Sequence, residues 1–152
     1  MKKRVIYGEE KNVDMATVIR PEISEKSKYW VEKHRYYELK HFCLQYPIWK
    51  KACLELDGFS KKPNIDRIAR TNIHSDPTVR CAMIKSLYSE RIKMVEVTAT
   101  QADPDLASYI IKAVTEELSY NYLKSRLDIP CSRDTYYDRY RRFFWLLDKA
   151  RD

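Results

Sequence analysis

The chain contains only two glycines, Gly8 and Gly58, in 152 residues. Phosphate-binding loops, dinucleotide-binding turns and the nucleophile turn of α/β-hydrolases all need clustered glycines, because their backbone takes positive φ angles or approaches a ligand closely. None of these sites can be assigned here. The scarcity of glycine, together with long stretches of Lys, Glu, Arg, Leu and Ala, argues against β-sandwiches and predicts an all-α protein.

Size and composition indicate a globular chain. A chain of 152 residues can bury a core without disulfides or metal, and 44% hydrophobic residues argue against disorder. The longest apolar run spans only residues 143–147, far short of the ~20 residues that a membrane span needs. We therefore expect no membrane association and an intracellular location.

The four cysteines indicate no metal site. Cys43, Cys53, Cys81 and Cys131 are 10, 28 and 50 residues apart, and these gaps match no zinc module. His34 and His41 are interpreted as packing or surface residues. His41 lies two positions before Cys43, and on a helix this spacing does not present both of these side chains to one metal ion. Since no acid/base pair or nucleophile set can be assigned either, we expect no cofactor, no metal and no enzyme activity.

The first half of the chain divides into three segments. Residues 1–22 mix charges without a clean period and are expected to form a poorly ordered arm. Residues 23–58 form an N-terminal helical segment that turns helical from Ser24, with a second helix beginning near Pro47. Residues 59–76 mix helix breakers with isolated apolar residues and are the predicted linker.

The aromatic face of residues 29–46 admits three interpretations. Its helical spacing favours protein core or a contact with a second copy of the chain over the stacking of single-stranded bases. If part of this face is a homo-oligomer contact, Leu39→Asp is expected to lower the mass in solution while helicity remains. Its members are Tyr29, Trp30, Tyr36, Tyr37, Leu39, Phe42, Cys43 and Tyr46.

Residues 77–152 form the second helical region. Asp76 and Pro77 are expected to start a helix of about six turns. Asp103 is expected to cap the next helix, which ends near Glu117 and has an apolar stripe. The stripe consists of Leu106, Ile110, Ala113 and Val114.

Residues 119–150 have the spacing of a helix-turn-helix. Ser119 can cap a short helix through Leu127 with Tyr122, Leu123 and Leu127 as its apolar side chains. The break at Ile129 and Pro130 is followed by Ser132, which can cap a last helix. The apolar stripe of that helix is Tyr136, Tyr140, Phe143 and Leu147.

Charge points to DNA as a partner. The 29 basic and 22 acidic residues give a net charge of +7, and residues 119–152 hold 8 basic and 5 acidic side chains. Basic surfaces attract the phosphate backbone. If the last helix enters a major groove, its first residues lie near base edges and its later arginines near phosphates; the alternative is an ordinary amphipathic helix. The predicted DNA-binding residues are Arg133, Thr135, Tyr137, Asp138, Arg139, Arg141, Arg142 and Lys124.

Residues 24–150 resemble a known family, most closely in the run from Ser119 to Asp148. With Ser75-Asp-Pro-Thr78 and Tyr36-Tyr-Glu-Leu-Lys40 upstream, this run is similar to phage and prophage late-transcription regulators of the RinA/ArpU type. The resemblance implies a C-terminal helix-turn-helix like that at the end of bacterial sigma factors. The turn from Asp128 to Arg133 departs from the pattern, because it lacks the glycine common in such turns.

The resemblance therefore implies a DNA-binding, phage-type transcriptional regulator in the cytoplasm of a bacterial host cell, with double-stranded DNA and host RNA polymerase as its expected partners. One alternative is a small-terminase-like DNA-packaging or assembly adaptor, in which the long helices build a ring. Another is a protein that binds host RNA polymerase or another host protein without touching DNA. A monomer or dimer in solution favours a regulator, whereas a ring of many subunits favours packaging.

Overall fold

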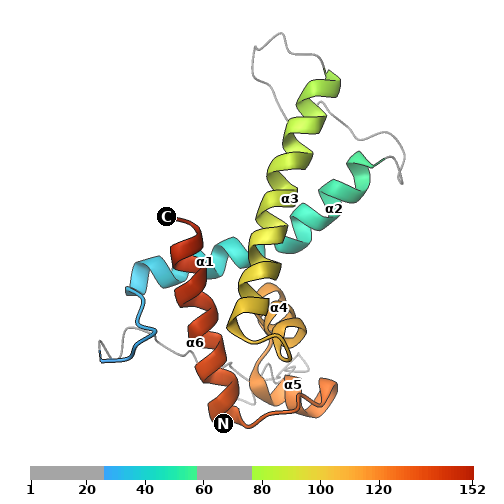
Figure 1. Ribbon diagram of the computed structural model, residues 1–152. Helices are drawn as coiled ribbons and strands as arrows, with labels where there is room; N and C mark the ends of the chain where they lie inside the picture. The colour runs from blue at the N-terminus through green and yellow to red at the C-terminus, as the bar shows by residue number, and fades with distance from the viewer. Residues whose placement is uncertain (1–25, 58–76) are drawn as a thin grey trace, which may run out of the picture.

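The computed structural model describes residues 26–57 and 77–152. Both ranges are helical and contain no β-strand, which confirms the predicted all-α class. The predicted arm, residues 1–22, and the predicted linker, residues 59–76, lie outside the described residues. The helices are α1 (Lys33–Leu44), α2 (Tyr46–Leu56), α3 (Pro77–Ala102), α4 (Ala107–Glu116), α5 (Tyr120–Leu127) and α6 (Arg133–Ala150) (Figure 1).

The predicted helix start at Ser24 lies outside the described residues, but residues 26–32 are not helical and the first helix begins at Lys33, later than predicted. The Ser27 hydroxyl accepts a hydrogen bond from the backbone N–H of Tyr29 at 3.3 Å. Such a local bond satisfies the backbone in a turn and so competes with helix formation. Glu32 then supplies the cap, because its carboxylate accepts hydrogen bonds from two N–H groups of the first turn.

The start of α4 also differs from the prediction. The Asp103 carboxylate accepts hydrogen bonds from the N–H groups of Asp105 and Leu106, at 2.9 and 3.3 Å. These bonds close a turn directly after α3, so the helix begins only at Ala107. The predicted stripe of this helix is confirmed by the burial of Leu106, Ile110, Ala113 and Val114.

Prolines start two helices, as predicted. Pro47 lies in the first turn of α2 and Pro77 is the first residue of α3. Asp76, the expected cap of α3, lies outside the described residues. With 26 residues, α3 has about seven turns. Its last turns are buried at Val95, Ala99 and neighbouring positions, whereas its first turns are not.

The core lies where α1, the second half of α3, α4 and α6 meet. Tyr36 of α1 packs edge-on against Phe144 of α6, with ring centroids 5.0 Å apart. Phe42 meets Trp49 of α2 at 4.8 Å. Leu39 is fully buried, at 0% exposure, within a single chain. The buried part of the aromatic face is therefore intramolecular core, and the prediction that Leu39 contacts a second copy is wrong.

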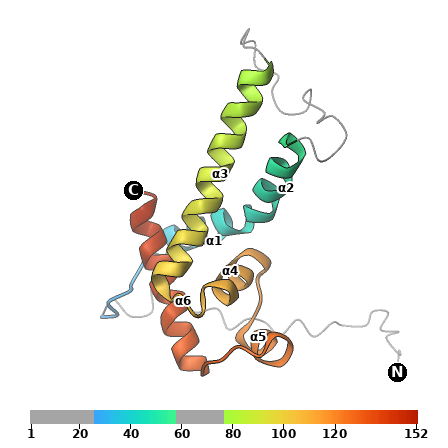
Figure 2. The same cartoon turned by 45° about the vertical axis from the view of Figure 1, so that its right-hand side comes forward.

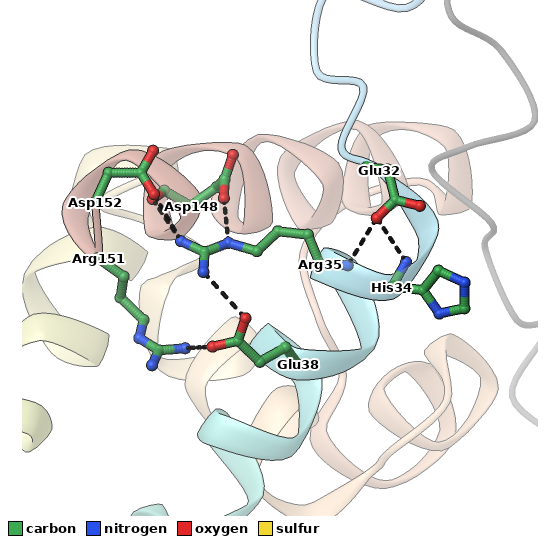
Figure 3. A network of polar contacts seen from close by, with 7 residues as sticks. All are labelled: Glu32, His34, Arg35, Glu38, Asp148, Arg151 and Asp152. Carbon is green, nitrogen blue, oxygen red and sulfur yellow. Dashed lines mark hydrogen bonds and ion pairs between the residues drawn. The ribbon is translucent and has the colours of Figure 1, made fainter.

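Ion pairs join the start of α1 to the end of α6 (Figure 3). Arg35 Nε donates to Asp148 at 2.5 Å, and the same guanidinium reaches Asp152 at 2.9 Å and Glu38 at 3.0 Å. Arg151 then donates to the second oxygen of Glu38 at 2.7 Å. We call this network the α1–α6 clamp. It connects residues more than a hundred positions apart, so it closes the fold between its N- and C-terminal parts.

Two helices project from the core as an antiparallel pair (Figures 1 and 2). This arm consists of α2 and the part of α3 that precedes the core; α2 packs against residues 85–96 of α3, and the first turns of α3 extend beyond α2 (Figure 1). Lys85 pairs with Asp57, and the Glu96 carboxylate accepts hydrogen bonds from Tyr46 at 2.5 Å and Lys50 at 3.0 Å. These contacts hold α2 against α3.

Candidate nucleic-acid interface

The predicted helix-turn-helix is formed by α5, residues 128–132 and α6. The Ser119 hydroxyl accepts a hydrogen bond from the N–H of Tyr122 at 3.2 Å, and the Ser132 hydroxyl accepts one from Thr135 at 3.3 Å. Both predicted caps are thus confirmed. The short helix lies near the start of the long one, at the end of the molecule opposite the arm (Figures 1 and 2).

Asp128 takes the place of the missing glycine in the turn. Its backbone lies in the left-handed region, with φ 50° and ψ 50°. Aspartate tolerates this conformation better than most residues because its short polar side chain can hydrogen-bond locally. The next N–H, that of Ile129, donates back to the carbonyl of Leu123 at 3.2 Å and so closes the end of α5. The helix-turn-helix therefore forms without glycine.

The turn is held against both helices. The Ile129 side chain is fully buried, and Lys124 of α5 donates to the Ile129 carbonyl at 3.3 Å. The Tyr120 hydroxyl donates to the carbonyl of Cys131 at 2.7 Å. The Tyr120 ring also contacts Tyr136 of α6, with centroids 5.7 Å apart. These contacts set the orientation of α6 relative to α5.

The first turn of α6 is exposed. Arg133, Asp134 and Thr135 all face solvent. The Arg133 guanidinium lies 5.6 Å from the centre of the Tyr137 ring, and the Thr135 hydroxyl is 2.9 Å from that of Ser132. The structure thus brings Arg133 and Thr135, two of the predicted base-reading residues, together at one accessible helix end.

Three other predicted DNA-binding residues contact side chains of the same chain. Arg139 Nε donates to Asp103 at 3.2 Å, and its guanidinium also pairs with Asp138 at 3.4 Å. Arg139 therefore ties α6 to the α3–α4 junction, which differs from the outward orientation that sequence reasoning favoured. Tyr137 is half-buried in a cluster of aromatic rings, which also contains Tyr120, Tyr136 and Tyr140.

The remaining predicted residues differ in exposure. Arg141 and Arg142 are half-buried, and neither forms an ion pair with another described residue. Lys124 lies on α5, where its ammonium is 3.8 Å from the Asp128 carboxylate. That pair is solvent-exposed and therefore weak, so Lys124 is accessible to another anion.

Sequence reasoning missed the exposed face of α5. Asn121, Tyr122, Ser125 and Arg126 all face solvent, whereas Leu123 is fully buried. Tyr122, predicted as an apolar side chain of this helix, is 44% exposed. The signal was present in the spacing, because residues between Leu123 and Leu127 must point away from the face that those leucines share.

The charge of this region comes from its arginines and lysines. Burial raises the pKa of Tyr136 and of Tyr140, so both phenols stay neutral over the physiological range. The Tyr140 hydroxyl is 3.0 Å from that of Tyr36, which further raises the Tyr140 pKa. The tyrosines therefore supply packing and add no negative charge that would oppose a phosphate.

Other chemistry finds little support in the described ranges. No group of three or more His, Cys, Asp or Glu side chains there could hold a metal ion. No helix within residues 26–57 or 77–152 is long and apolar enough to cross a membrane. All four cysteines are free thiols, and burial raises the pKa of Cys43 to about 12, so that thiol stays protonated and unreactive.

Comparison of the chain with protein-family models, with curated proteins and with solved structures finds no match.

Proposed function

We propose that this protein binds double-stranded DNA through α5, the turn and α6, and that it regulates transcription. The observation that carries the proposal is the exposed first turn of α6, with Arg133 and Thr135 accessible to solvent. In helix-turn-helix proteins the first residues of the second helix reach base edges, and the first helix crosses the backbone. The exposed Arg126 and Lys124 on α5 suit such a backbone contact.

Electrostatics supports the same surface. Residues 119–152 hold 8 basic and 5 acidic side chains. Asp103, which lies outside this segment, pairs with Arg139. Arg126, Arg141 and Arg142 form no ion pair with a described residue and so keep their full charge for phosphates. Each phosphate that a basic side chain neutralises releases counterions, which favours binding at low salt.

The regulatory role follows from the resemblance to phage late-transcription regulators and not from the fold, because a helix-turn-helix also serves in DNA packaging. We propose DNA near the protein's own gene as the target and the host RNA polymerase as a further partner. Binding to that DNA in preference to unrelated sequence is the property that separates a regulator from a protein that binds DNA without sequence choice.

Fluorescence anisotropy with labelled DNA from the flanks of its own gene tests the proposal. Arg133→Ala is expected to lower the preference for this DNA over a scrambled duplex by about 1–3 kcal/mol, since the residue lies at the base-reading end. Arg141→Ala is expected to weaken binding to both duplexes equally and to lower the slope of log K against log salt by about 1.

Lys51→Ala is the matched control. Lys51 is an exposed basic residue on α2, in the arm and away from α5 and α6 (Figure 1). Lys51→Ala removes one positive charge, as Arg141→Ala does, and is expected to leave the slope of log K against log salt unchanged. The proposal fails if a folded Arg133→Ala, Arg141→Ala double variant binds the flanking DNA as tightly as the parent at both low and physiological salt.

A further inference from the structure

Helix α3 is apolar on two opposite sides. One side packs on α2 and on the core, through residues such as Tyr88, Ile92 and Val95. A second group of apolar residues lies on the other side. With 3.6 residues per turn, its members spread over only about 80° around the helix axis. We call this group the outer stripe of α3, and it consists of Val79, Met83, Leu87, Met94 and Val97.

The outer stripe faces solvent. Its exposed fractions are 51% for Val79, 67% for Met83, 45% for Leu87 and 43% for Val97, and only Met94 is partly covered by the core. Helices that are apolar on all sides are ordinarily buried. A row of this length on a projecting arm differs from scattered surface residues and is typical of an interaction site.

The order of residues along the stripe indicates what covers it. Val79 and Val97 lie nine positions before and after residue 88, and Met83 and Met94 lie almost equally far from the same point. A second α3 laid antiparallel across this midpoint therefore places valine near valine and methionine opposite methionine. Such self-complementarity is what a twofold contact requires, because each pair of residues then occurs twice.

The surface beside Met94 also fits a second copy. A hollow of about 370 Å³ lies between α3, α1 and the end of α6. Its lining is mixed, with apolar side chains from Phe42, Leu87, Met94 and Ala150 and polar or charged ones from Gln45, Glu90, Arg91, Arg151 and Asp152. In the antiparallel arrangement the most exposed apolar side chain, Met83 of the second copy, lies opposite this hollow. Methionine is flexible and fills irregular gaps well.

The contact contains one charged residue from each copy. Within the arc of the stripe the only charged residue between positions 79 and 97 is Glu90. The antiparallel arrangement places it opposite Leu87 of the second copy, about 4.5 Å along the axis from that copy's Glu90. Arg91 of the second copy lies one helical turn from Leu87 and offsets this repulsion. The predicted DNA-binding end of the molecule, α5 and the first turn of α6, lies away from the arm (Figure 1), whereas the end of α6 borders the hollow.

We propose that the protein is a homodimer formed by antiparallel contact between the outer stripes of two α3 helices. The contact leaves the exposed first turn of α6 uncovered in both copies. This proposal does not rest on DNA binding, since it is carried by the arm alone.

Sedimentation equilibrium of the full chain tests the dimer, at concentrations from about 1 to 100 μM because assembly follows mass action. The expected mass is twice the 18.3 kDa of one chain. Met83→Glu is expected to raise the dissociation constant by about 100-fold or more, because a charge is then buried against the apolar side chains of the second copy's outer stripe. Circular dichroism checks that the variant keeps its helicity.

Leu54→Glu is the matched control. Leu54 is 59% exposed and lies on α2, in the same arm but outside the outer stripe. Leu54→Glu introduces the same negative charge as Met83→Glu and is expected to leave the mass in solution unchanged. A dimer that dissociates equally with Leu54→Glu and with Met83→Glu would not be held by this stripe.

A charge pair tests the antiparallel register. Met94→Lys alone is expected to weaken the dimer, and Met83→Glu combined with Met94→Lys is expected to restore at least tenfold of the lost affinity, because the two new charges meet between copies. Within one helix they are about 16 Å apart and cannot pair. The proposal is overturned by a parent that stays monomeric at 100 μM, by a dimer that resists Met83→Glu, or by a double variant no tighter than Met83→Glu.

Discussion

Single residues with unusual backbone angles end two of the described helices. Glu117 has φ 54° at the end of α4, and Asp128 has φ 50° at the end of α5. Glycine ordinarily occupies such positions because it has no Cβ to clash with the backbone. In a chain so poor in glycine, polar residues take this conformation, and its effect on the free energy of unfolding can be measured.

Substitution at Asp128 tests that cost. Asp128→Gly is expected to change the free energy of unfolding by less than about 0.5 kcal/mol, because relief of the left-handed strain offsets the greater freedom of the unfolded chain. Asp128→Val is expected to lower it by about 1–2 kcal/mol, since a β-branched residue tolerates positive φ poorly. Urea unfolding followed by circular dichroism measures both.

The same pair of changes at Ser125 is the control. Ser125 lies inside α5, where the backbone is right-handed, so there glycine is expected to cost slightly more than valine. Equal effects of glycine and valine at Asp128 would mean that the left-handed angle does not determine stability at this turn.

At the scale of helices, the α1–α6 clamp connects elements that pack mainly through apolar side chains. Hydrogen bonds from Arg35 and then Arg151 lower the pKa of Glu38 below its ordinary value. A lowered pKa in the folded state means that the ionised carboxylate stabilises the fold. This stabilisation is complete above the ordinary glutamate pKa of about 4.3 and is lost as the pH falls through the lowered pKa.

Glu38→Gln is expected to lower the urea midpoint at pH 7, and the difference from the parent is expected to shrink as the pH falls below the ordinary glutamate pKa, because the stabilising charge of the parent is then lost. The two unfolding curves should therefore converge as the pH falls. Glu116→Gln is the control, since Glu116 is exposed and forms no ion pair with a described residue. A constant difference between parent and Glu38→Gln from pH 7 to pH 3 would assign the effect to packing and not to charge.

At the scale of the whole molecule, the N-terminal and C-terminal parts share one core. Tyr36, Leu39 and Phe42 of α1 are buried with α6 residues, and Trp49 of α2 lies beneath Arg91 of α3. Burial of large apolar side chains contributes about 1.5–3 kcal/mol each. The segment before the predicted linker is thus an integral part of the fold.

Limited trypsin digestion is expected to cut first within residues 59–76, which contain four basic residues and lie outside the described helices. Because both sides of the cut share the core, the fragments are expected to stay associated. A denaturing gel should show two bands, whereas gel filtration should show one peak at the position of the uncut protein. Separation of the fragments, or first cleavage within residues 77–101, would contradict this expectation.

The sequence by itself determined the class of fold and most of its local features. The scarcity of glycine and the helical spacing of apolar residues predicted helices, and the structure confirms α2, α3, α5 and α6 near the predicted positions. The caps at Ser119 and Ser132 were predictable because capping depends on a hydroxyl and a backbone N–H only three residues away. Interactions between residues so close in the chain can be predicted from the local sequence.

Tertiary structure alone decided which side chains of the candidate site are accessible. Arg139 and Arg141 were both predicted to bind DNA, yet Arg139 pairs with Asp103, a residue 36 positions away, and Arg141 does not. Leu39 became core because α6 lies against α1, and the outer stripe of α3 stayed exposed because α2 covers only the opposite side. A periodic pattern shows that a helix has an apolar face, but which neighbour covers that face depends on contacts between residues distant in the chain.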